Sequence, residues 1–199
     1  MFRWFTLLIV CAATHAPITI ASDQSTLTEL VERGNVMEIS AALQAGKFTS
    51  RALTKHYLDR IDRYDEAYRA ILAINPNAVN DAIKTDEMRS QGSRAPLLGI
   101  PVLIKDNIET RELPTTAGAL ALRGNRTNRD APLIAQLRKA GAIILGKTNL
   151  SEWANFRSER SSSGWSTVGG QTRNPYDLFA HPADQAQGLA RRLRPASRP

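Results

Sequence analysis

The sequence predicts an α/β fold in which a mixed or parallel sheet lies between helices. Two short runs, residues 102–104 and 142–145, are apolar and short enough to be buried strands. Between them, residues 131–140 are predicted to form a helix with Leu133, Ile134 and Leu137 pointing inward, and Gly141 ends it. A strand, a helix and a second strand in this order predict a right-handed crossover between parallel strands.

The segment before the first of these strands is mainly helical by its apolar periodicity. Thr26 and Glu29 have the spacing of a capping box, and Ser50 is a candidate N-cap for a later helix. Pro76 follows a short apolar strand at a position that suits the first turn of a helix. The predicted helices cover 26–33, 37–45, 50–64, 76–90, 115–122 and 131–140, and the strands cover 70–74, 102–104 and 142–145.

Composition is that of a globular protein, with 42% hydrophobic and 23% charged residues among 199. The net charge of +7 is concentrated at the ends, because the last 21 residues contain four arginines and one aspartate. The central body has no basic face with interleaved aromatic residues, which argues against a nucleic-acid partner.

The first 21 residues have the order of a secretory signal. Arg3 precedes an apolar run from Phe5 to Ala13, and small residues follow up to Ala21. The run is too short to span a bilayer stably, so we expect export to the periplasm or medium and no membrane association after cleavage. Cleavage near Ala21 would remove Cys11, the single cysteine, and with it any disulfide, thiol nucleophile or thiolate metal site.

The strand at 102–104 ends on a charged triplet, Lys105, Asp106 and Asn107. Strand ends are where α/β enzymes gather functional residues, because the sheet is rigid and the following loop can vary. A lysine after an apolar strand is more often a solvated loop residue, so the triplet alone decides nothing. A second triplet, Lys147, Thr148 and Asn149, lies at the exit of the strand at 142–145.

Four motifs in order give a more specific indication. They are GIPVLIKDN at 99–107, Thr116-Ala117-Gly118, GAIILGKTNLSEWANF at 141–156, and GGQTRNPYDL at 169–178. Together they resemble the amidase signature family, and within it the bacterial peptide amidases, over residues 27–178. The resemblance implies a serine hydrolase of linear carboxamides, acting on small-molecule or peptide amides, with no cofactor and no metal.

The resemblance also implies roles for individual residues. The family uses a triad of a serine, a bridging cis-serine and a lysine, and Lys105 matches the lysine of the KDN motif. That role requires a neutral amine, which can accept a proton relayed through the bridging serine. Ala154 and Asn155 match a segment that lines the substrate in the family.

Both serines of the triad are expected after NPYDL, in loops rich in glycine and serine. The chain instead continues with the basic segment 179–199, so we divide it into a signal at 1–21, part of an amidase domain at 22–178 and an out-of-register tail. When the codons of this tail are read in the shifted frame, their degeneracy permits RSPCGSSSGS, the type of loop that the family requires. We therefore interpret the tail as the product of a frameshift near Leu178.

Two classes of function remain open at this stage. In the first, the chain derives from an exported amidase and is inactive because it lacks both serines. In the second, it is a non-catalytic binding module that retains the amidase face. For the first class we also expect marginal stability, because an incomplete sheet leaves apolar faces and strand edges in water.

Overall fold

The computed structural model describes residues 21–176, apart from 157 and 159. Residues 1–20 of the predicted signal and the tail at 179–199 lie outside the described residues. The helices are α1 Ala21–Arg33, α2 Val36–Gln44, α3 Ser50–Tyr68, α4 Ala78–Ser90 and α5 Pro132–Lys139, with short 3₁₀ helices η1 Leu120–Leu122 and η2 Glu152–Asn155. The strands are β1 Ile71–Ile74, β2 Pro101–Lys105, β3 Ile143–Thr148, β4 Trp165–Ser166 and β5 Gly170–Gln171.

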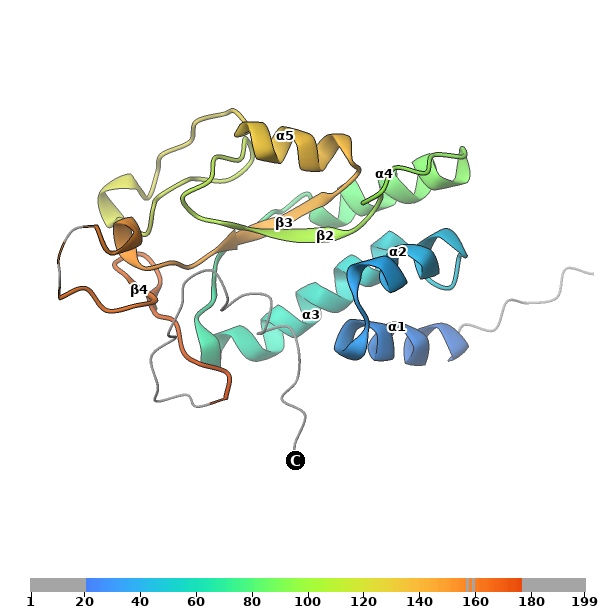
Figure 1. Cartoon of the computed structure of the whole chain (residues 1–199), viewed down its shortest axis with the longest axis horizontal. Coiled ribbons are helices and arrows are strands. Elements are labelled where there is room, and N and C mark those ends of the chain that lie inside the picture. Colours follow the sequence, from blue (N-terminus) through green and yellow to red (C-terminus); the bar gives the residue numbers. More distant parts are fainter. Residues whose placement is uncertain (1–20, 157, 159, 177–199) are drawn as a thin grey trace, which may run out of the picture.

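The main sheet has the strand order β1-β3-β2, with β3 in the centre. The β2 and β3 strands are parallel and joined through α5, whereas β1 is antiparallel to β3. Figure 1 shows α5 on one side of this sheet and α1 to α3 on the other. The predicted α/β class with a mixed sheet between helices is therefore confirmed.

Side chains of the sheet alternate between two apolar layers. Ile104 and Ile144 pack with Ile134 of α5, and all three side chains are buried. Ile143 and Leu145 point to the other face, where they pack against α3 and α4. A strand covered on both faces must be apolar at successive positions, which explains the continuous run in β3.

Helix ends differ in part from the predicted ones. The capping box lies at Asn35 and Glu38, where the Asn35 side chain accepts from the backbone N–H groups of Met37 and Glu38. Thr26 is internal to α1, so the capping box predicted there is wrong. Thr49 is the N-cap of α3, and Ser50 is the first helical residue.

The helix α5 shows one prediction that holds and one that does not. Gly141 follows its C-cap with φ +92°, and a Cβ there would lie 2.7 Å from the Cα of Leu98. A side chain at this position would therefore meet both strain and a close backbone neighbour. Leu133, predicted to point inward, is 53% exposed, because the helix turns Ile134 rather than Leu133 toward the sheet.

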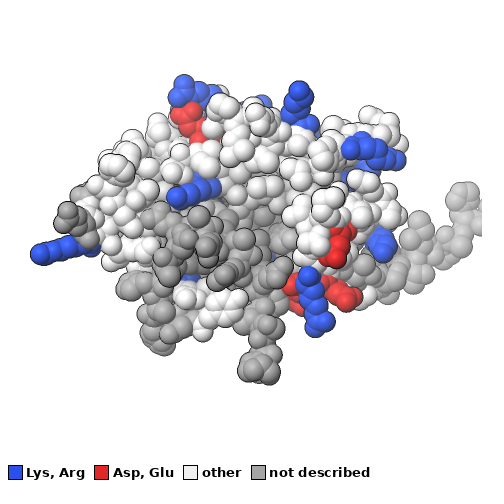
Figure 2. All heavy atoms as spheres, in the orientation of Figure 1, with Lys and Arg blue, Asp and Glu red and all other residues white. Residues whose placement is uncertain are grey.

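The surface in Figure 2 shows lysine and arginine side chains spread around the molecule, some of them beside acidic residues. On this face they form no continuous basic patch among the described residues. Within the same residues, no helix combines the length and the apolar character that crossing a membrane requires.

Candidate active site

Lys105 is the last residue of β2 and pairs with Thr148 in the parallel register of β2 and β3. The apolar side chains before it belong to the core, and the lysine is half-buried at the edge of that core. The backbone N–H of Ile108 donates to the Lys105 carbonyl at 3.0 Å, which closes a tight turn directly after the strand. The structure thus places Lys105 at the carboxyl end of a rigid strand, as the sequence predicted.

Asp106, the next residue, organises the surrounding loops. Its side chain is buried, and its carboxylate accepts hydrogen bonds from the backbone N–H and the hydroxyl of Thr116. The same carboxylate lies 3.3 Å from the Nζ of Lys147. Charged groups are buried only when they are paired and hydrogen-bonded, and this carboxylate meets both conditions.

Lys147 lies within β3, with Ala73 opposite it in β1 and Ile104 opposite it in β2. Its side chain is fully buried, so the prediction that Lys147 lies at the exit of the strand is wrong. Burial lowers the pKa of its ammonium group, and the carboxylate of Asp106 opposes that shift.

The Thr116-Ala117-Gly118 motif connects the turn after β2 with the segment at 152–155. Ala117 donates its N–H to the Asp106 carbonyl, and its own carbonyl accepts from the N–H of Trp153. Gly118 has φ +78°, and a Cβ there would lie 2.8 Å from the Cβ of Ser166. Glycine is needed here because both the conformation and the space exclude a side chain. No helix covers 115–119; only η1 follows, so the helix predicted over 115–122 is mostly absent.

Residues Trp153, Ala154 and Asn155 have φ values of 50°, 54° and 66°. Three consecutive non-glycine residues in the left-handed region are strained, and such strain is concentrated at functional sites. Asn155 is half-buried, and its Oδ1 atom is buried without a hydrogen-bond partner among the described residues.

Asn155 also lines a hollow of about 460 Å³ together with Glu152, Trp165 and Thr167. The carboxylate of Glu152 accepts from the backbone N–H and the hydroxyl of Thr167, at 2.9 and 2.6 Å. Ala154, which precedes Asn155 in the chain, is exposed. The segment predicted to bind substrate therefore has an unsatisfied acceptor and an adjacent cavity, and it is joined to the Lys105 turn through Ala117.

Among the residues that the structure describes, no group of three or more His, Cys, Asp or Glu side chains could hold a metal ion. The polar side chains that meet in the loop after Lys105 are those of Asp106, Thr115, Thr116 and Lys147. Of these, the motifs in the sequence include Asp106, Thr116 and Lys147 but not Thr115. The sequence analysis placed Lys147 after the strand and missed its role. Extending the strand from the apolar run through Lys147 to the Thr-Asn pair would have predicted a lysine inside the sheet.

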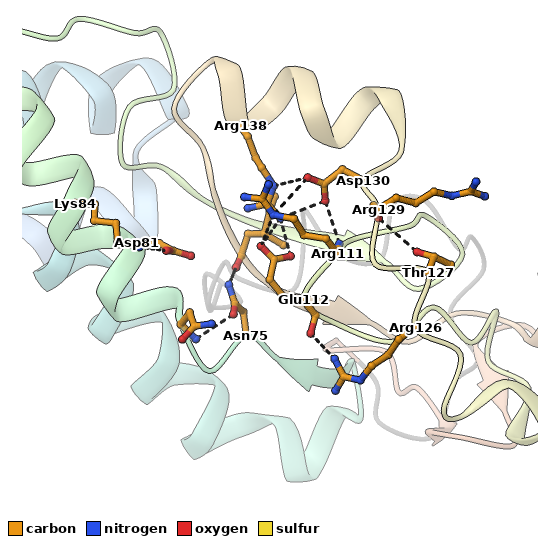
Figure 3. A network of polar contacts seen from close by, with 12 residues as sticks. Asn75, Asp81, Lys84, Arg111, Glu112, Arg126, Thr127, Arg129, Asp130 and Arg138 are labelled. Atoms are coloured by element: carbon orange, nitrogen blue, oxygen red, sulfur yellow. Dashed lines mark hydrogen bonds and ion pairs between the residues drawn. The ribbon is translucent and has the colours of Figure 1, made fainter.

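An ion-pair network fixes the outer side of the loop that follows Lys105 (Figure 3). Arg138 of α5 contacts Asp130 at 2.9 Å and Glu112 at 2.5 Å. The backbone N–H of Arg111 donates to Asp130, and Arg126 donates to the Glu112 carbonyl. The loop after β2 is thereby tied to the last turn of α5 and to Asp130, the residue before its N-cap.

The pKa of Asp130 gives this network a testable pH dependence. Burial alone would raise that pKa, but hydrogen bonds from Arg138 and the Arg111 backbone hold it below its ordinary value. The unfolded chain then binds more protons in acid, so the stabilisation is present above about pH 4 and is lost as the pH falls.

We expect Asp130→Asn to lower the free energy of unfolding by roughly 1–3 kcal/mol at pH 7, because Arg138 loses a half-buried charged partner. The difference from the parent chain should shrink at pH 3.5, as measured by urea denaturation. Asp81→Asn is the matched control, since the ion pair of Asp81 is with the exposed Lys84 at 3.4 Å. Equal losses for Asp130→Asn at both pH values would contradict the assignment.

Comparison with known proteins agrees with this geometry. The sequence matches the Amidase family over residues 52–182. It is 37% identical over 187 residues to an Arabidopsis thaliana protein described as an amidase, covering 92% of this chain and 36% of that protein. It is 36% identical over 167 residues to a glutamyl-tRNA(Gln) amidotransferase component from Halorhodospira halophila, covering 81% of this chain and 34% of that protein.

Two solved structures are similar as well. The peptide amidase of Stenotrophomonas maltophilia superposes with a TM-score of 0.76 and 48% identity, covering 79% of this chain and 33% of that one. An amidase family protein from Bacillus anthracis gives a TM-score of 0.78 and 36% identity, covering 87% of this chain and 35% of that one.

The fold is an α/β fold with a mixed sheet between helices, and the matched residues are those of amidase-type sequences. It belongs to the amidase signature family. It spans about a third of the length of the relatives named above.

Proposed function

We propose that this chain carries the lysine-bearing part of a serine amidase that hydrolyses linear carboxamides. The observation that carries the proposal is the position of Lys105, half-buried at the carboxyl end of β2 in a chain of the amidase signature family. The turn after Lys105 is fixed by backbone and side-chain hydrogen bonds, which is the preorganisation that a proton acceptor requires.

In the proposed reaction, the neutral amine of Lys105 takes a proton from a bridging serine, which takes one from the nucleophilic serine. The nucleophile attacks the carbonyl carbon of the amide, and the resulting tetrahedral intermediate expels the amine with the relayed proton. Water then hydrolyses the acyl-enzyme. This sequence needs no metal and no cofactor.

On the substrate side, we propose that Ala154 and Asn155 line the amide-binding site. The unpartnered Oδ1 of Asn155 is an acceptor that suits the N–H groups of a carboxamide. Similarity to a peptide amidase supports C-terminal peptide amides as one substrate class, beside small carboxamides. We propose no nucleic-acid partner and no membrane association for the mature chain.

We propose that the chain as written has no amidase turnover, because it lacks a serine in register with either family serine after NPYDL. Restoring the reading frame near codon 178 should supply them. The test is an assay of the purified chain and its frame-restored version against a simple carboxamide. Turnover by the unrestored chain that disappears with Lys105→Ala would contradict the proposed inactivity.

One observation favours the second candidate function, that of a binding module. The hollow beside Asn155 is lined by Glu152, Trp165 and Thr167, none of which takes part in the proposed proton relay. A carboxamide that binds the frame-restored protein and the original chain equally, without turnover by either, would support binding over catalysis.

We also propose export, because a charged residue, an apolar run and small residues occur in order over 1–21. The mature protein should then begin near Ser22 and be found in the periplasm or medium. Intact-mass measurement of the protein expressed in a bacterial host would check this. Cytoplasmic protein that retains Met1 would count against export.

A further inference from the structure

The ammonium group of Lys147 is enclosed by four oxygen atoms from two segments of the chain. Its Nζ lies 2.7 Å from the carbonyl of Ile108 and 2.9 Å from the hydroxyl of Thr115. The carbonyl of Pro114 and the carboxylate of Asp106 lie at 3.3 Å each. We call these four groups, on Asp106, Ile108, Pro114 and Thr115, the oxygen cage.

The cage closes the loop between β2 and the Thr116-Ala117-Gly118 motif from both ends. Asp106 and Ile108 belong to the start of this loop, and Pro114 and Thr115 belong to its end. An ammonium group has three N–H donors, and here each of them can meet an oxygen without water, because the side chain is fully buried. Without the cation, the buried carboxylate and the carbonyls would lose their shared donor.

The same loop determines where Lys105 lies. The N–H of Asp106 donates to the Thr148 carbonyl, and the N–H of Ile108 donates to the Lys105 carbonyl. Lys105 is therefore followed closely by two residues whose oxygens contact Lys147. Movement of the cage would move the backbone that presents Lys105.

We propose that Lys147 is a positioning residue that holds the Lys105 turn, and that its cage is a built site for a primary ammonium ion. The importance of this turn for amide hydrolysis rests on the proposed function, whereas the cage itself does not. Lys147 does not touch a reacting atom in this proposal. It acts by drawing two loop ends around one buried cation.

Hydrogen exchange of the 199-residue chain tests the cage without any enzyme assay. In Lys147→Ala, amides of 105–118 should exchange about tenfold faster or more, whereas those of α3 should change little. Adding n-propylammonium, which matches the side-chain atoms removed by this substitution, should restore protection of these amides. The restored protection should reach a plateau as the n-propylammonium concentration rises. Tetramethylammonium has the charge but no N–H donor, so it should restore nothing.

Two further variants keep the test decisive. Lys147→Met keeps most of the side-chain volume, so it should lose protection over 105–118 and gain nothing from n-propylammonium. Lys139→Ala, an exposed lysine on α5, should behave like the parent chain. If Lys147→Ala fails to fold, the Met variant decides alone.

Parent-like exchange in Lys147→Met would overturn the proposal, because it would show that the cation is not needed. Equal loss of protection in α3 would also overturn it, because Lys147 would then support the whole fold rather than the turn. Equal restoration of protection by tetramethylammonium would overturn it as well, because the effect would then come from added salt and not from N–H donors in the oxygen cage. Because no outcome depends on amide hydrolysis, failure of the cage and failure of the proposed amidase function are distinguishable.

Discussion

In the frame-restored protein, Lys105→Ala is expected to lower kcat by about 1000-fold or more, while the unrestored chain shows no turnover with or without the substitution. Members of a catalytic triad act as a unit, so loss of the proton acceptor removes most of the catalysis that the triad provides. Lys105 lies at the end of β2 in a fixed turn, where no other described lysine occupies an equivalent strand end.

The measurement is steady-state kinetics on a simple carboxamide, with kcat and KM determined separately. Lys139→Ala is the control, because this lysine is exposed on α5, away from the buried Ile134. A kcat within about threefold of the parent for Lys105→Ala would show that the base lies elsewhere. Frame-restored protein that folds but does not turn over any carboxamide would instead count against the amidase proposal as a whole.

Asn149→Ala is expected to have the largest effect on stability, with a loss of about 2–4 kcal/mol in the free energy of unfolding. The Asn149 side chain is buried after β3 and donates to the carbonyls of Arg69 and Gly170 and to the hydroxyl of Thr172. Its Oδ1 accepts from the N–H of Leu150 and the hydroxyl of Ser166. Alanine would leave several of these buried groups without a partner.

Urea denaturation of the 199-residue chain at pH 7 measures this effect, with Gln136→Ala on the exposed side of α5 as the control. Hydrogen exchange should show the first loss of protection in β4 and β5, because Asn149 connects them to the main sheet. If Asn149→Ala lowers the free energy of unfolding no more than the control does, water replaces the hydrogen bonds of the Asn149 side chain at little cost in stability.

Local patterns in the sequence determined the elements and the class of fold. The apolar runs of β2 and β3 and the helical spacing of α5 depend on neighbours within a few residues, and they predicted parallel strands with a helical crossover. The KDN triplet predicted Lys105 at a strand end, which the structure shows, because the apolar run stops at this residue. The catalytic role of Lys105 and the substrate roles of Ala154 and Asn155 came from the family resemblance and stay predictions.

Only the tertiary structure decided the surroundings of those residues. Lys147 is buried because β1 and β2 both pair beside it, and Gly146 allows the Ala73 carbonyl to approach to within 2.4 Å of where a Cβ would lie. Local sequence cannot show that two distant strands and a loop at 106–115 surround one lysine with oxygens. The left-handed conformations at 153–155 likewise begin at Trp153, whose N–H donates to the Ala117 carbonyl. This contact joins segments far apart in the chain, and such long-range contacts leave no periodic signal in the sequence.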